Sequence, residues 1–69
     1  MDNIFIKDEF IKLGQALKLS GEVSSGVDAK FMIADGLVKV NNVTCTQRGK
    51  KLYEGDKIEF NGNEYIICK

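Results

Sequence analysis

Residues 24–42, SSGVDAKFMIADGLVKVNN, carry the signals of a capped helix that is followed at once by a strand and a tight turn. Ser24 or Ser25 is placed to cap the first helical turn, and Asp28 stands at the acidic position of a capping box. Gly36 is a typical residue at the end of a helix. We therefore expect a short helix that ends at this glycine.

The residues after this helix predict two hairpins. Leu37 to Val40 adopts a two-residue period, Asn41-Asn42 favours a reversal, and Val43 to Thr46 is able to return as a partner strand. Further along, Asn61-Gly62-Asn63 separates the segments KIEF and EYIICK and is the strongest hairpin signal in the chain.

The residues before the central segment predict one strand and one helix. Asn3 to Lys7 is apolar and short, which favours an edge strand. Taking Glu9 to Leu19 as helical places Phe10, Leu13 and Leu17 on one stripe. The predicted fold class is α+β, with two short N-terminal helices packed on one face of a small antiparallel sheet.

Length and composition indicate a single domain that spans residues 1–69. A chain of 69 residues with 43% hydrophobic and 29% charged residues has an ordinary globular composition. No segment is apolar and long enough to cross a membrane, and the charged start MDNIFIKDEF is unlike an export signal. We therefore expect a cytoplasmic monomer with no membrane partner.

Charge is distributed unevenly although the formal net charge is zero. Residues 30–51 carry five basic residues against Asp35 alone, and no acid stands between Asn41 and Tyr53. Because screening limits each charge to a reach of roughly 8–10 Å, local charge decides whether a face attracts a polyanion. This distribution predicts one basic face.

The sequence offers little for catalysis or for binding a cofactor, a metal or a small-molecule substrate. It has no histidine, and its two cysteines, Cys45 and Cys68, form no CxxC pair. Its seven glycines form no phosphate-loop pattern. We therefore expect no enzyme activity, no cofactor, no metal and no small-molecule substrate.

Three ordered segments resemble a known family. The segments KLGQALKLSGEVSSGVDAK, FMIADGLVKVNN and RGKKLYEGDKIEF are similar to the RNA-binding domain first described in ribosomal protein S-four, also called the alpha-L motif. The resemblance spans about Phe10 to Phe60. Within the family, SSGVDAKF and QRGKKLYEGD resemble the small stand-alone YaaA/YbcJ-like members.

The resemblance implies a non-catalytic module that docks on structured RNA, with ribosomal RNA as one candidate, through two helices and the basic loop Gln47 to Lys51. Matching the family's motifs onto this sequence gives six candidate RNA-binding residues: Lys12, Ser25, Lys30, Arg48, Lys50 and Lys51. Many members with larger attached domains carry an aspartate where Gly14 stands and an arginine where Gly26 stands. The loss of that arginine implies either weaker affinity or a compensating contact from the basic loop.

Several alternatives remain open at this level. The basic loop is also compatible with a solvated turn, with a protein-interaction adaptor in translation or replication, or with a duplex DNA binder. Phe31 is placed to stack on an unpaired base if it is exposed, but in so small a domain we expect it to pack on the first helix.

Overall fold

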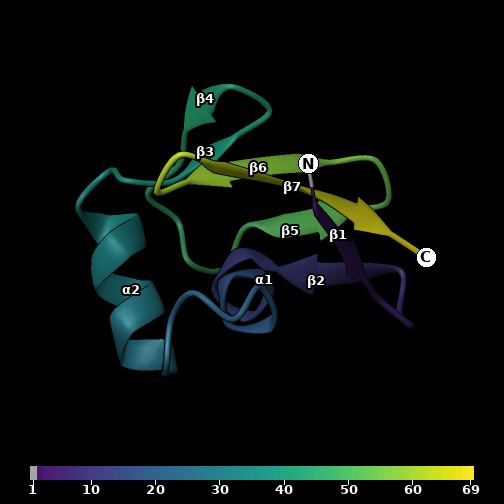
Figure 1. The fold of residues 1–69 in the computed structure, drawn as a ribbon, viewed down its shortest axis with the longest axis horizontal. Coiled ribbons are helices and arrows are strands. Elements are labelled where there is room, and N and C mark those ends of the chain that lie inside the picture. The colour runs from purple at the N-terminus through teal and green to yellow at the C-terminus, as the bar shows by residue number, and fades with distance from the viewer. Residues whose placement is uncertain (1) are drawn as a thin grey trace.

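The computed structural model describes residues 2–69 and contains two helices and seven strands (Figure 1). In chain order these are β1 (Asp2–Phe5), β2 (Phe10–Lys12), α1 (Leu13–Leu19), α2 (Gly26–Ala34), β3 (Lys39–Val40), β4 (Val43–Thr44), β5 (Lys51–Tyr53), β6 (Lys57–Phe60) and β7 (Asn63–Cys68). Both helices lie on the same side of the larger sheet (Figure 1). The α+β class is confirmed.

The larger sheet has five strands in the order β1-β7-β6-β3-β4. Neighbouring strands are antiparallel except for β1 and β7, which pair in parallel with Asp2 opposite Tyr65 and Phe5 opposite Cys68. The expectation of a purely antiparallel sheet is wrong at this pair. Parallel neighbours need a long crossover, and here all the other elements lie between the two strands.

Both predicted hairpins are confirmed, and each has a two-residue turn. Asn41 and Asn42 have φ angles of 51° and 70°, and Asn61 and Gly62 have φ angles of 53° and 76°. Two consecutive residues with positive φ characterise the type I′ turn, whose twist suits antiparallel strands. The paired segments β3 and β4 are shorter than the sequence pattern predicted.

Helix α2 has the predicted signals at both ends. The Ser25 hydroxyl oxygen accepts a hydrogen bond from the amide of Asp28 at 3.3 Å. At the other end, Gly36 has a φ of 75° and donates to the carbonyl of Ile33, while Leu37 donates to the carbonyl of Met32. This pair of bonds is a Schellman motif, which satisfies carbonyls that the helix leaves unpaired.

The first helix is shorter than expected. Residues 10–12, which were predicted as part of this helix, form β2 and pair with β5, with Ile11 opposite Leu52. Ile11 and Leu52 are buried, whereas Lys12 and Lys51 are exposed. Burial of an apolar pair across two strands therefore decides the conformation of this segment, and α1 begins directly after it. We call the two-stranded sheet of β2 and β5 the ribbon.

The core lies between the helices, the ribbon and the inner face of the five-stranded sheet. Its fully buried side chains come from every layer: Leu13, Leu17, Ala29, Ile33, Val38, Leu52, Ile58, Phe60 and Ile67. Among residues 2–69, no helix has the length and apolar character needed to span a membrane.

Candidate nucleic-acid interface

The loop between β4 and β5 is fixed to the start of α1 by two backbone hydrogen bonds. The amide of Leu13 donates to the carbonyl of Lys50 at 2.9 Å, and the amide of Gly14 donates to the carbonyl of Arg48 at 3.1 Å. The first amides of a helix have no partner within the helix, and α1 has no side-chain cap. The loop therefore supplies the cap, and this fixes its basic residues relative to α1.

The Arg48 side chain crosses α1 at Gly14. A Cβ atom at position 14 would lie 2.8 Å from Arg48 Cγ and 3.3 Å from Arg48 Cδ, closer than side chains tolerate. The glycine thus provides the space in which the arginine lies.

A groove with a volume of about 300 Å³ runs between α1, the start of α2 and the loop. We call it the basic groove. Its lining residues are Lys12, Gly14, Gln15, Lys18, Gly26, Arg48 and Gly49. Three of these residues are cationic and none is acidic, so the groove presents positive charge to solvent.

The cations of this region have no acidic partner. Across residues 2–69, the structure contains one ion pair, between Lys57 Nζ and Glu64 Oε2 at 3.5 Å, and it lies on β6 and β7. The charges of Lys12, Lys18 and Arg48 are therefore available to an external anion.

The start of α2 borders the basic groove through Gly26, and Ser25 precedes it. The Ser25 oxygen accepts the capping bond from Asp28, so its hydroxyl hydrogen remains able to donate. Ser24 donates to the Asp28 carboxylate at 2.6 Å and holds this acid at its own helix end. Ser25 is thus fixed beside the groove by its structural role.

The structure brings some of the six candidate residues together and separates others. Lys12 and Arg48 line the basic groove, and Ser25 stands next to it. Lys51 is the strand partner of Lys12 on the ribbon, and its Nζ lies 4.9 Å from the centre of the Phe10 ring. Lys30 is exposed on α2 but does not line the groove.

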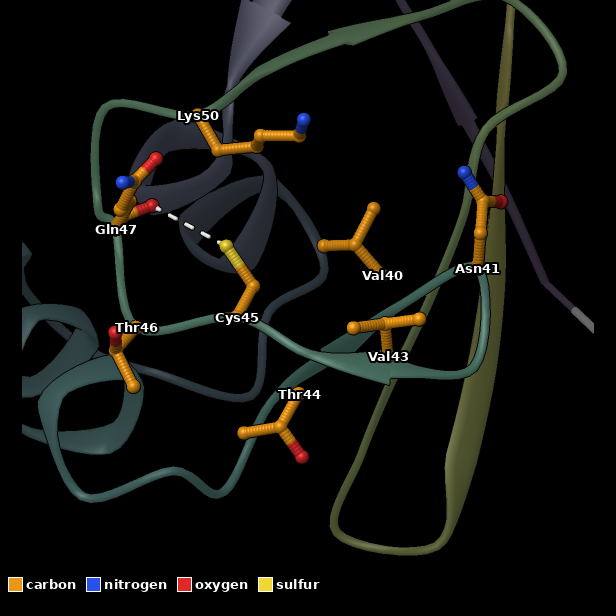
Figure 2. Close-up of a pocket in the computed structure, with 8 residues that line it drawn as sticks. All are labelled: Val40, Asn41, Val43, Thr44, Cys45, Thr46, Gln47 and Lys50. Atoms are coloured by element: carbon orange, nitrogen blue, oxygen red, sulfur yellow. Dashed lines mark hydrogen bonds between the residues drawn. The ribbon is translucent and has the colours of Figure 1, made fainter.

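Lys50 lines a different cavity, with a volume of about 430 Å³, which is bordered by the β3–β4 hairpin and the following loop (Figure 2). Val40 and Val43 form part of its wall, and the Cys45 thiol donates a hydrogen bond to the carbonyl oxygen of Gln47 at 3.7 Å (Figure 2). Cys45 and Cys68 are both free thiols.

Lys18 lines the basic groove although the sequence did not mark it as a site residue. Lys18 lies near the C-terminal end of α1, where a cation also stabilises the negative end of the helix dipole. Its position in the sequence is therefore compatible with a structural role as well as with a binding role. Helical spacing was the available signal, because Lys18 lies four residues after Gly14 and three after Gln15 and shares their face.

Phe31 is 60% exposed on α2, so the expectation that it packs on the first helix is wrong. The cavity that it borders is also lined by Glu22 and Asp28. The buried face of α2 is formed by Ala29 and Ile33 instead, because these two residues lie on the opposite side of the helical turn.

The connection between α1 and α2 is anchored to β7 by a polar cluster. Tyr65 donates a hydrogen bond to the Glu22 carboxylate, and the Asn63 amide donates to both Glu22 oxygens at 3.0 Å. The hydrogen bond to Glu22, followed by burial, raises the pKa of Tyr65 to about 12. This cluster joins the connection between the helices to the larger sheet.

No group of three or more histidine, cysteine, aspartate or glutamate side chains within residues 2–69 is arranged to hold a metal ion.

Comparison with known families and proteins gives consistent matches. The model of the S4 domain family matches residues 4–68. "Probable ribosome maturation protein RlbA" of Bacillus subtilis (strain 168) is 44% identical over 59 residues, which are 86% of this chain and 83% of that protein. "Putative RNA-binding protein YbcJ" of Escherichia coli (strain K12) is 37% identical over 61 residues, which are 88% of this chain and 87% of that protein.

Among solved structures, the 30S ribosomal protein S4e from Thermoplasma acidophilum matches with a TM-score of 0.66 and 31% sequence identity. The match covers 87% of this chain and 32% of the ribosomal protein, so the chain spans about a third of that protein.

Proposed function

This chain belongs to the S4 domain family, and we propose that it is a non-catalytic module that binds structured RNA through the basic groove. The observation that carries the proposal is the lining of that groove, where Lys12, Lys18 and Arg48 converge without an acidic residue. Ser25 beside the groove and Lys51 on the ribbon extend the proposed contact surface, and Lys30 and Lys50 complete it at longer range.

The geometry favours recognition of phosphate positions. Double-stranded RNA hides its base edges in a deep and narrow major groove, so a shallow positive surface reads its shape and backbone. The capping bonds hold the Arg48 backbone next to α1, and its planar guanidinium is able to bind a phosphate with two parallel hydrogen bonds. On this proposal, Arg48 replaces the arginine that many family members carry at position 26.

The names of the matched proteins point to ribosomal RNA or its precursors as the class of RNA. One relative is named for ribosome maturation, and the matched solved structure is a ribosomal protein. We propose that this chain acts on the same class of RNA in the cytoplasm.

Salt dependence tests the proposal. The affinity for a fluorescent RNA hairpin is measured by anisotropy over a series of salt concentrations. Four phosphate contacts, from Lys12, Lys18, Arg48 and Lys51, predict that log K falls against log salt with a slope of about −3.6. Arg48→Gln lowers the affinity and brings the slope about one unit closer to zero.

A charge-matched variant provides the control. Lys39→Gln removes the same charge from the exposed side of β3, opposite Glu59 and outside the lining of the groove, so its affinity and slope stay close to those of the wild type. A flat salt response, or an equal loss from Lys39→Gln, contradicts the proposal. A DNA hairpin of matching sequence that binds as tightly as the RNA identifies a duplex binder without preference for RNA.

A further inference from the structure

The outer face of the ribbon combines one exposed and one half-buried aromatic ring, Tyr53 and Phe10, with two cations that form no ion pair within residues 2–69. Residues alternate between its two faces, so Phe10 and Lys12 of β2 share the outer face with Lys51 and Tyr53 of β5, while Ile11 is buried. The Phe10 and Tyr53 rings are cross-strand partners with centroids 6.0 Å apart. Tyr53 is 49% exposed although the adjacent Leu52 is fully buried.

Two cations stand side by side on this face, and one of them contacts an aromatic ring, because Lys51 Nζ lies 4.9 Å from the centre of the Phe10 ring. Lys12 and Lys51 are direct cross-strand partners, and like charges in this position destabilise a strand pair. Neither lysine forms an ion pair within residues 2–69. Two adjacent cations attract a phosphate, and the neighbouring aromatic pair offers a surface on which a base is able to stack. A nucleotide carries both groups.

The aromatic face continues into the basic groove. Lys12 belongs to both surfaces, since it lines the groove and faces Lys51 on the ribbon. The backbone at Tyr53 is held by a 2.7 Å bond from its amide to the Asp56 carboxylate, so the ring is presented from a fixed turn. An RNA strand that leaves the groove past Lys12 reaches these rings next.

We propose that the ribbon binds an unpaired nucleotide that adjoins the docked RNA helix, with the base stacked on Tyr53 and its phosphate held by Lys12 and Lys51. This inference rests on the proposed function and narrows the RNA class to helices with a single-stranded extension, bulge or junction next to the contact. Aromatic stacking accepts every base, so the site recognises the unpaired state and has little sequence preference.

Phe31 of α2 is also exposed and follows Lys30 in the chain, but no cation lines the cavity that it borders. The cavity next to it is lined by Glu22 and Asp28, and these acids repel a phosphate. Phe31 therefore serves as the matched control for Tyr53.

The test uses the whole chain and two RNA probes, a blunt hairpin and the same hairpin with a short 3′ extension that carries 2-aminopurine at its first unpaired position. We expect the extension to raise the wild-type affinity about 10-fold and to quench the 2-aminopurine fluorescence on binding. Tyr53→Ala loses this gain but binds the blunt hairpin like the wild type. Tyr53→Phe and Phe31→Ala keep the gain, and circular dichroism verifies the fold of each variant.

The outcomes separate the two proposals. The inference is overturned if the wild type binds both probes equally, if its 2-aminopurine signal does not change on binding, or if Tyr53→Ala keeps the gain. Failure of the wild type to bind either probe overturns the proposed function and this inference with it. Because the fluorescence readout uses the wild type, it decides the question even if Tyr53→Ala does not fold.

Discussion

The shape of the basic groove at Gly14 depends on the absence of a Cβ atom. The missing side chain lets Arg48 lie across α1, and the amide of the same glycine fixes the carbonyl of Arg48. One residue thus contributes both a space and a hydrogen bond. A glycine inside a helix normally costs about 0.5–1 kcal/mol relative to alanine, so its presence here is explained by the position of the arginine.

Gly14→Ala is expected to weaken RNA binding about 10-fold, the lower end of the range for one charge-assisted contact, because the new methyl group displaces Arg48 from the groove. The free energy of unfolding is expected to change by less than about 1 kcal/mol, since the gain in helix propensity offsets the displacement. Fluorescence anisotropy and chemical denaturation measure the two quantities.

The combination with Arg48→Ala is the control for this variant. If the methyl group acts only by displacing the arginine, Gly14→Ala has no further effect on affinity in the Arg48→Ala background. Additive losses in the double variant would show that Gly14 affects binding by another route.

At the scale of elements, the N-terminus of α2 combines a structural role with a proposed binding role. Ser25 caps the helix and stands beside the groove. Aspartate caps helices about as well as serine but adds a negative charge. We expect Ser25→Asp to keep the free energy of unfolding within about 0.5 kcal/mol and to lower RNA affinity several-fold.

Ser25→Ala separates the two effects, because it removes the cap without adding charge and is expected to cost about 1 kcal/mol of stability. Its affinity should lie between those of the wild type and Ser25→Asp. Equal RNA binding by Ser25→Asp and the wild type would place the start of α2 outside the interface.

Local signals predicted α2 and the two hairpins because each is specified by neighbouring residues. These signals are Ser25, Gly36 and the Asn-Asn and Asn-Gly turns, and each determines the backbone conformation of only the few residues next to it. The family resemblance was likewise visible in short ordered segments, and it is confirmed by the match over residues 4–68.

Non-local pairings set the features that the sequence did not predict. The strand β2 has three residues, too few to distinguish a strand from a helical stripe, and its partner β5 lies far along the chain. The parallel pairing of β1 with β7 has the same cause. The basic groove also depends on distant segments. Helical spacing places Lys18 on the same face as Gly14, but the approach of the loop to that face is a non-local contact.

At the scale of the whole molecule, the Glu22–Tyr65 bond joins the helical layer to the sheet. The pKa of Tyr65 is raised from its ordinary value of 10.0 to about 12, so the folded protein keeps a proton that the unfolded chain releases. The stabilisation is fully present below pH 10 and is lost as the pH rises towards 12. The free energy of unfolding is therefore expected to fall across this interval.

Tyr65→Phe is the matched variant, because it keeps the ring and removes the titrating hydroxyl. All other side chains are the same in the two proteins, so the difference between their denaturation curves isolates Tyr65. We expect the wild type to lose its stability advantage over Tyr65→Phe between pH 10 and 12. Parallel pH profiles would show that the Glu22–Tyr65 bond does not link protonation to folding.

The placement of β7 between β1 and β6 has a consequence for biosynthesis. Strand β1 is the first described strand to be synthesised, and it pairs with β7, the last one. It therefore has no strand partner until the other elements have been synthesised. Contacts of such long sequence separation slow folding, because the chain loses much entropy when it closes them. The edge of the sheet at β1 therefore closes only after the nascent chain has supplied β7.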